Sequence, residues 1–228
     1  MNKFALIFAS LAAIAQHTPA LAQETGTLIT RKAAQIDGNS VADSRRAMED
    51  FAKCLVSREG GRVSKLIDLP VDTKDAENAL DAIYGQTDEC LSDGQLRMNE
   101  LGLRGAIFQA LYERDYSANA VLSFPAELQT GYRNNYPAEL SDKARMYVSL
   151  NHFSECVARA DPNGVRQLIT SRVGSSTETT SFTALLPKLS ACIVKDNEIR
   201  FSKSNLKGFL AEGLYRLSRA SSQKVSGE

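Results

Sequence analysis

The sequence predicts an all-α protein made of two tandem helical repeats, with about four helices and one disulfide bond in each. Three observations lead to this fold class: apolar residues recur at helical spacing, the chain matches itself at a shift of about one hundred residues, and its four cysteines form two equally spaced pairs. With 43% hydrophobic residues, the 228-residue chain has the composition of a globular protein. Its 27 basic and 27 acidic residues balance, which argues against a nucleic-acid partner.

The N-terminus has the layout of a secretory signal peptide at 1–22. Lys3 precedes an apolar run at 4–15, and a small-x-small pattern ends at Ala22. A membrane anchor is the alternative, but the run is shorter than the roughly 20 residues that a bilayer requires. We therefore expect a mature chain that begins at Gln23, is periplasmic or secreted, and contains no transmembrane segment.

The remaining chain contains an internal repeat. Residues 51–55 (Phe-Ala-Lys-Cys-Leu) return as residues 153–157 (Phe-Ser-Glu-Cys-Val), and Cys90 returns as Cys192. The two cysteine pairs therefore have the same spacing. Such agreement at one shift indicates a duplication.

The match continues at a shift larger by one residue. Residues 103–105 (Leu-Arg-Gly) correspond to 206–208 (Leu-Lys-Gly), and Tyr112 corresponds to Tyr215. The sequence thus divides into four parts. They are the signal peptide at 1–22, helical repeat 1 at 23–115 (copy 1), a connector at 116–140 and helical repeat 2 at 141–228 (copy 2).

Each copy is expected to begin with a helix that has one apolar face. The residues that define this face are Ala47, Phe51, Cys54 and Leu55 in copy 1, and Met146, Leu150, Phe153 and Val157 in copy 2. A short second helix follows. In copy 2 it begins with Asp161 as N-cap and Pro162 at the first helical position.

The third helix of copy 1 is expected to continue to Leu91. In copy 2 its counterpart starts at a capping box formed by Ser175 and Glu178 and contains Pro187, which should kink or split it. The last helix is marked in both copies by apolar residues at helical spacing. These are Leu103, Ile107, Ala110 and Leu111, and Leu206, Leu210, Leu214 and Leu217.

Little else in the chain has a regular pattern. Residues 96–98 and 199–201 are the candidates for brief extended structure, and the polar ends at 23–39 and 219–228 are expected to be frayed.

The connector carries aromatic residues and turn signals. Its aromatic residues are Tyr116, Phe124, Tyr132 and Tyr136. They can line a ligand groove, but such residues more often hold a connecting segment onto the units it joins. We expect the second role and keep the groove as the alternative.

The four cysteines allow three pairings. Because each copy would then carry its own link, the duplication favours Cys54–Cys90 and Cys156–Cys192. A zinc site formed by the four cysteines is disfavoured by their wide spacing, and free thiols are the remaining alternative.

Two further pairs of matched residues lie in the last helices. Gly105 and Gly208 each cost a helix about 1 kcal/mol relative to alanine, which predicts the close approach of a neighbouring helix. Arg104 and Lys207 are expected to be exposed to solvent.

No catalytic, cofactor-binding or metal-binding motif occurs in the sequence. The mature chain has one histidine, His152, and its counterpart in copy 1 is Asp50. We interpret His152 as a surface residue and assign no catalytic residue, no cofactor site and no metal site. Paired carboxylates of a hydrolase have no sequence signature and stay open.

The repeated pattern Phe-x-x-Cys-Leu/Val, a second cysteine and Leu-Arg/Lys-Gly-x6-Tyr resembles a set of uncharacterised secreted α-helical repeat proteins of sphingomonad-type α-proteobacteria. The resemblance covers 45–113 and 145–216, and copy 2 departs from it at Lys207 and Pro187. It implies a Gram-negative envelope setting and carries no known activity to any residue.

These observations favour an exported, non-catalytic binding protein of the bacterial envelope. Its partner would be a protein or another envelope component, bound through the groove between the copies or through the connector. The alternative is a small periplasmic hydrolase that uses paired carboxylates.

Overall fold

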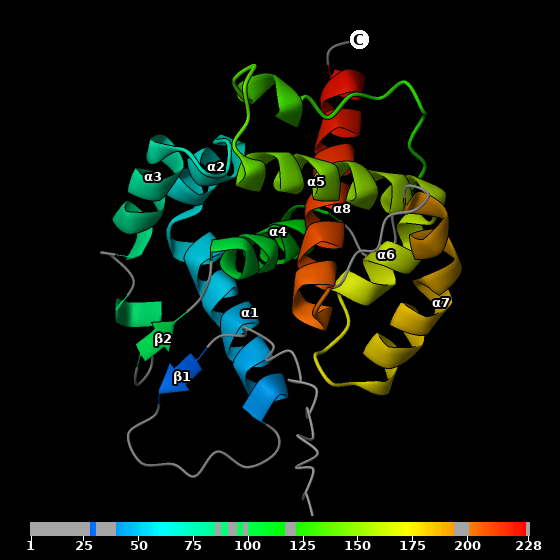
Figure 1. Ribbon diagram of the computed structural model, residues 1–228. Helices are drawn as coiled ribbons and strands as arrows, with labels where there is room; N and C mark the ends of the chain where they lie inside the picture. Colours follow the sequence, from blue (N-terminus) through cyan, green and yellow to red (C-terminus); the bar gives the residue numbers. More distant parts are fainter. Residues whose placement is uncertain are drawn as a thin grey trace, which may run out of the picture.

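The computed structural model describes residues 28–30, 40–84, 88–90, 95–97, 100–116, 122–193 and 201–226. The expected signal peptide lies outside these residues. In the described part of the chain, eight α-helices and one short two-stranded ribbon form the fold, so the predicted all-α class is confirmed (Figure 1).

The helices follow the order expected from the repeat. Copy 1 contains α1 (Ser40–Arg58), α2 (Gly60–Asp68), α3 (Lys74–Tyr84) and α4 (Glu100–Asp115), and copy 2 contains α5 (Asp142–Ala160), α6 (Pro162–Ile169), α7 (Ser176–Cys192) and α8 (Lys203–Ser226). The smaller elements are the 3-10 turns η1 (Asp88–Cys90) and η2 (Tyr132–Asn135), and the strands β1 (Leu28–Thr30) and β2 (Gln95–Arg97).

The two last helices, α4 and α8, cross in the middle of the molecule (Figure 1). Every residue of 103–112 and of 207–218 is buried, so neither helix has a solvent-exposed face over that length. One continuous hydrophobic core includes residues of both copies. The two segments therefore fold around a shared centre.

The crossing of α4 and α8 places Gly105 against Gly208, so the predicted close approach of a neighbouring helix is confirmed, and the neighbour is the matched helix. A Cβ atom on Gly105 would lie 2.6 Å from the Cα atom of Gly208, and one on Gly208 would lie 2.8 Å from the Cα atom of Gly105. Corresponding residues that contact each other favour a two-fold relation between the copies over a translational one.

Both predicted disulfide bonds are present, Cys54–Cys90 and Cys156–Cys192. In copy 2 the bond joins α5 to the last residue of α7, as expected. In copy 1 Cys90 lies in η1, because α3 ends at Tyr84 and does not reach the cysteine. Leu91, where this helix was expected to end, lies outside the described residues.

Several local predictions hold and others are wrong. The Asp161 side chain accepts a hydrogen bond from the Gly164 amide at 2.8 Å, and Ser175 accepts one from the Glu178 amide at 3.1 Å, so both N-caps are confirmed. The α7 helix runs unbroken through Pro187.

The chain ends differ most from expectation. The α8 helix continues to Ser226, so 219–226 is helical rather than frayed, because its preceding turns are held in the core. Leu28–Thr30 forms a strand that pairs antiparallel with Gln95–Arg97. On α5, Met146 is 49% exposed and the neighbouring Tyr147 is buried in its place.

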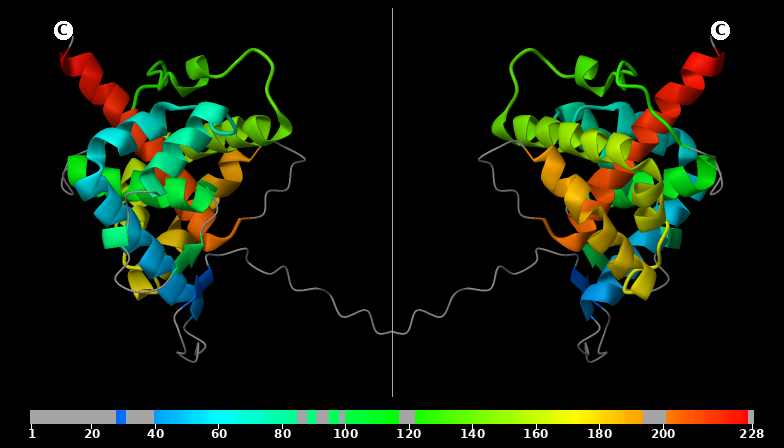
Figure 2. Two further views of the ribbon diagram at one scale, coloured as in Figure 1. Left: turned by 90° about the vertical axis from the view of Figure 1, so that its left-hand side faces the viewer. Right: turned by 90° about the vertical axis from the view of Figure 1, so that its right-hand side faces the viewer.

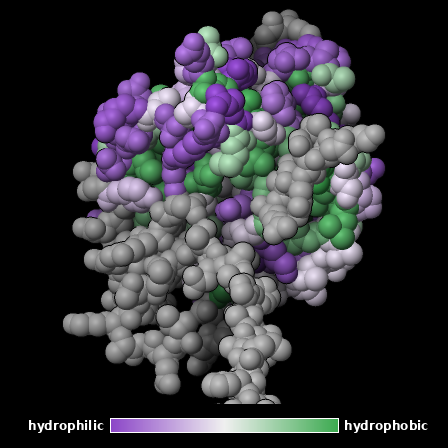
Figure 3. Space-filling view, in the orientation of Figure 1, coloured by the Kyte–Doolittle hydropathy of each residue, from purple (hydrophilic) through white to green (hydrophobic). Residues whose placement is uncertain are grey.

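The connector passes over one end of the helical body, where it lies against α5 (Figure 2). The face seen in Figure 3 is mainly hydrophilic at this end, with hydrophobic residues visible between the polar ones lower down. Among the described helices, none combines the length and apolar character needed to cross a bilayer.

Candidate functional site

Two buried clusters of charged residues flank the crossing of α4 and α8. Arg104 and Lys207, the matched basic residues, are at their centres and are only 4% and 1% exposed. The prediction that they are exposed to solvent was wrong. The reason is that both central helices are covered on every side, so their polar residues are buried along with the apolar ones.

Arg104 and Lys207 occupy corresponding places in the two copies. Arg104 donates through Nη1 to the Leu66 carbonyl at 3.2 Å and through Nη2 to the Ile67 carbonyl at 2.8 Å, at the end of α2. Lys207 Nζ donates to the Ser171 carbonyl at 2.8 Å, just beyond α6. Each cation thus satisfies carbonyl groups at the negative end of the second helix of its own copy.

The Arg104 cluster also contains Tyr147 of α5 and Glu212 and Arg216 of α8. Arg104 Nε donates to the Tyr147 hydroxyl at 2.5 Å, and this hydroxyl donates to the Glu212 carboxylate. Arg216 Nε donates to Glu212 Oε1 at 2.9 Å, and its Nη2 donates to the Ile67 carbonyl at 2.9 Å. Two buried guanidinium groups therefore share one buried carboxylate.

Burial raises the pKa of Tyr147, and although Arg104 favours ionisation, the negative charge of Glu212 adds to the rise. The hydroxyl therefore stays protonated at neutral pH. In that form it is both an acceptor for Arg104 and a donor to Glu212, which its hydrogen bonds require.

The Lys207 cluster is balanced in charge. Lys207 Nζ lies 2.9 Å from Glu49 Oε1 and 3.6 Å from Glu178 Oε1, and Glu178 also pairs with Arg45 at 2.5 Å. Two cations thus face two carboxylates. The equivalent places in the Arg104 cluster carry Asn151 instead of Glu49 and Tyr147 instead of Arg45.

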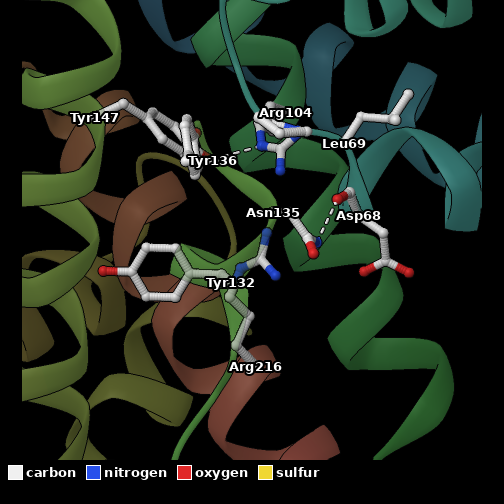
Figure 4. Close-up of a pocket in the computed structure, with 9 residues that line it drawn as sticks. Asp68, Leu69, Arg104, Tyr132, Asn135, Tyr136, Tyr147 and Arg216 are labelled. Atoms are coloured by element: carbon white, nitrogen blue, oxygen red, sulfur yellow. Dashed lines mark hydrogen bonds between the residues drawn. The ribbon is translucent and has the colours of Figure 1, made fainter. Parts of the chain in front are cut away.

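A pocket opens beside the Arg104 cluster, beneath the connector (Figure 4). It is formed by the end of α2, by both arginines and by η2 of the connector. The residues that define it are Asp68, Arg104, Tyr132, Asn135, Tyr136 and Arg216. About 200 Å³ lies between the lining atoms, including the open mouth, but only about 10 Å³ of it can hold the centre of a water molecule. The enclosed part of the pocket therefore has room for about one water-sized atom.

The connector is held at this pocket by its own side chains. The Tyr136 hydroxyl accepts a hydrogen bond from the Val71 amide at 3.0 Å, and Asn135 Nδ2 donates to the Asp68 carbonyl at 2.9 Å. The Tyr132 hydroxyl donates to the Val148 carbonyl at 3.3 Å. The connector aromatics here fix the segment, which is the expected role, and they also line a pocket.

The other connector aromatics do not reach the pocket. Tyr116 packs between the rings of Tyr112 and Tyr215, with centroids 5.2 Å and 5.8 Å away, and Phe124 packs against the core. His152 is exposed on α5, with its ring 5.8 Å from that of Tyr132, as expected for a surface residue. In the described residues, no three His, Cys, Asp or Glu side chains are grouped so as to hold a metal ion.

Sequence reasoning missed Tyr147, Glu212 and Arg216. A signal for the last two was present in the sequence comparison of the two copies. Glu212 stands in place of Gln109 and Arg216 in place of Glu113, both in a helix whose neighbouring residues are largely apolar. Charged residues among apolar neighbours on all helical faces indicate a buried ion pair rather than a solvated face.

Comparison with known proteins gives no match: no protein family, no curated protein and no solved structure matches the chain. Function must therefore be inferred from the sequence and from the site.

Proposed function

We propose that this chain is an exported, non-catalytic binding protein of the bacterial envelope, and that it binds its partner where the connector crosses the junction of the two copies. The observation that carries this proposal is the pocket beneath the connector, which receives residues from copy 1, copy 2 and the connector. Its wall presents guanidinium and phenol groups, side-chain types that are enriched where proteins bind their partners.

The setting is supported by two properties of the chain. Both disulfide bonds are of the kind that persists in oxidising compartments outside the cytoplasm. The sequence at 1–22 and the resemblance to secreted α-proteobacterial repeat proteins favour the same compartment.

The hydrolase alternative requires two carboxyl groups in a pocket, one of them with a raised pKa. Glu49 and Glu178 do meet, but both are bound to Lys207. Burial opposes ionisation of Glu178, yet hydrogen bonds from Arg45 and the Gly174 amide outweigh it, so its pKa is lowered. A carboxyl group with a lowered pKa is a poor general acid at neutral pH, which favours the binding proposal.

Site-specific photo-crosslinking tests this proposal. A photoreactive residue would replace Arg133, which is exposed in η2 beside the pocket, in the chain exported by an α-proteobacterium. The matched control would replace Thr180, exposed near the start of α7 at the opposite end of the molecule from the connector (Figure 1). We expect a discrete crosslinked species at Arg133 that is absent at Thr180. Equal crosslinking at both positions, or none at Arg133, would contradict the proposal.

A further inference from the structure

We propose that the pocket between Arg216 and the connector binds one oxyanion group, a carboxylate or a phosphate, carried by the ligand or partner. This inference rests on the proposed function and names the chemistry that the same pocket recognises. It follows from the local charge, from the free hydrogen-bond donors and from the size of the pocket.

The local charge is positive. Arg104 and Arg216, each with a side chain 5% exposed, share the single buried carboxylate of Glu212. The other carboxylate in the pocket wall, Asp68, is half-exposed and is already paired with Arg219 at 2.6 Å. Three guanidinium groups thus face two carboxylates. The end of α2 offsets part of the excess through its carbonyl groups, but a buried positive charge without a full counter-charge favours an added anion.

The duplication supplies an internal comparison. At the corresponding place around Lys207, two cations face two carboxylates and the cluster needs no external anion. Both clusters have the same helical framework, so the excess at Arg104 is not a consequence of the fold. It arises from side chains that differ between the copies. Asn151 occupies the place that Glu49 has in the Lys207 cluster, and Arg216 adds a second cation beside Arg104.

Two hydrogen-bond donors remain available in the pocket. Arg216 uses Nε and Nη2, and Nη1 forms no hydrogen bond with any described residue. Figure 4 shows its guanidinium group directed toward Asn135. The Tyr136 hydroxyl accepts from the Val71 amide and donates to no described residue. A guanidinium group and a phenol among the residues that line one pocket are suited to the oxygen atoms of a carboxylate or phosphate.

The size of the pocket limits how much of the ligand enters. Only about 10 Å³ can hold the centre of a water molecule, which is about the space of one water, so one oxygen atom of the oxyanion group enters and the rest of the ligand stays at the mouth. The pocket therefore recognises a terminal charged group rather than enclosing a whole small molecule.

Charge substitution in the connector tests the inference without disturbing the buried cluster. Asn135 is exposed at the pocket wall, and Asn134, its neighbour in η2, is exposed and does not line the pocket. The variants Asn135→Asp and Asn134→Asp make the same change of charge one residue apart. Each mature chain would be titrated with sodium acetate and with sodium phosphate at constant ionic strength in chloride, and binding followed by amide chemical shifts in NMR.

In the natural chain we expect saturable changes in the amide chemical shifts around the connector. Comparison of the acetate and phosphate titrations shows whether the pocket binds a carboxylate or a phosphate. Asn135→Asp should weaken binding at least about tenfold, because a carboxylate at the mouth repels the anion and competes for Arg216. It also removes the donor to the Asp68 carbonyl, and Asn135→Ala, which loses that hydrogen bond without adding charge, should weaken binding less. Asn134→Asp should change the affinity for the anion by less than about twofold, because its added charge lies outside the pocket and is more strongly screened. Tyr136→Phe, which adds no charge, should weaken binding several-fold through the loss of one donor and of the hydrogen bond from the Val71 amide that holds the connector.

Shifts no larger than those caused by chloride, or equal binding in both aspartate variants, would overturn the inference. Its failure can be told apart from failure of the proposed function. If Arg133 crosslinks to a partner while neither anion binds, the connector is an interaction site but the pocket is not an oxyanion site.

Discussion

Gly105 of α4 and Gly208 of α8 lie in contact through their backbones, and the two glycines are matched when the sequence is compared with itself. A side chain at either position would meet the backbone of the opposite helix, which has no flexible end to move aside. The contact brings the two copies together at the centre of the core and sets how far apart the buried clusters lie on either side.

Gly105→Ala and Gly208→Ala should each destabilise the fold by about 1–3 kcal/mol, because the added methyl group overpacks a helix crossing. Gly61→Ala is the control, since a Cβ atom there would meet nothing within 4 Å. In a helix it should be neutral or stabilise by up to about 1 kcal/mol. Urea unfolding measures all three, and an effect of Gly105→Ala no larger than that of Gly61→Ala would contradict the close approach.

Removing either disulfide bond should lower the free energy of unfolding by about 2–5 kcal/mol. The paired variants are Cys54→Ser with Cys90→Ser, and Cys156→Ser with Cys192→Ser. Each pair closes a loop of the same length, so the two losses should be similar, and because the core is shared the whole chain should unfold in one transition. Separate transitions for the two copies would show that they fold independently.

Arg104→Ala should cost about 3–5 kcal/mol, because it leaves buried carbonyl groups and part of the Glu212 charge without a partner. Arg104→Lys gives copy 1 the residue type that copy 2 has at the matched position, Lys207. It should lower the free energy of unfolding by less than Arg104→Ala does. Arg133→Ala, at an exposed position, should change stability by less than about 0.5 kcal/mol. Denaturant unfolding of the three variants decides this, and equal effects at positions 104 and 133 would contradict the role of Arg104.

The protein should lose stability in alkaline solution through its tyrosines. Burial raises the pKa of every one of the seven tyrosines in the sequence, and that of Tyr215, which donates to Asp115, rises to about 12. Because the folded state then binds these protons more tightly than the unfolded state, their contribution is complete below about pH 10 and is lost as the pH rises toward 12.

Tyrosinate absorbance measures this directly. The titration midpoint of the folded chain should lie above that of the chain unfolded in urea, and the urea midpoint of unfolding should fall over the same pH range. Coinciding titration curves in the two states would contradict the burial of the hydroxyl groups.

The sequence determined the helical class, both disulfide pairs and the close approach of a helix at Gly105 and at Gly208. These features have local or repeated signals. Apolar residues at helical spacing indicate a helix face, and equal cysteine spacing indicates a disulfide bond within each copy. Glycine at a matched helical position indicates a close neighbouring helix. The N-caps at Asp161 and Ser175 were predictable for the same reason, because a cap is formed by residues close together in sequence.

Only the tertiary structure decided what surrounds the charged residues of α4 and α8. Exposure of Arg104 was expected because charged residues usually face solvent, but a helix covered on all sides buries its polar residues as well. The pairing of Leu28–Thr30 with Gln95–Arg97 and the pocket under the connector likewise join segments far apart in the chain. Sequence spacing carries no information on such contacts, because they depend on how distant segments pack, within copy 1 for the strand pair and across the two copies for the pocket. That packing places one excess positive charge beside Tyr136, where the connector crosses the junction of the two copies.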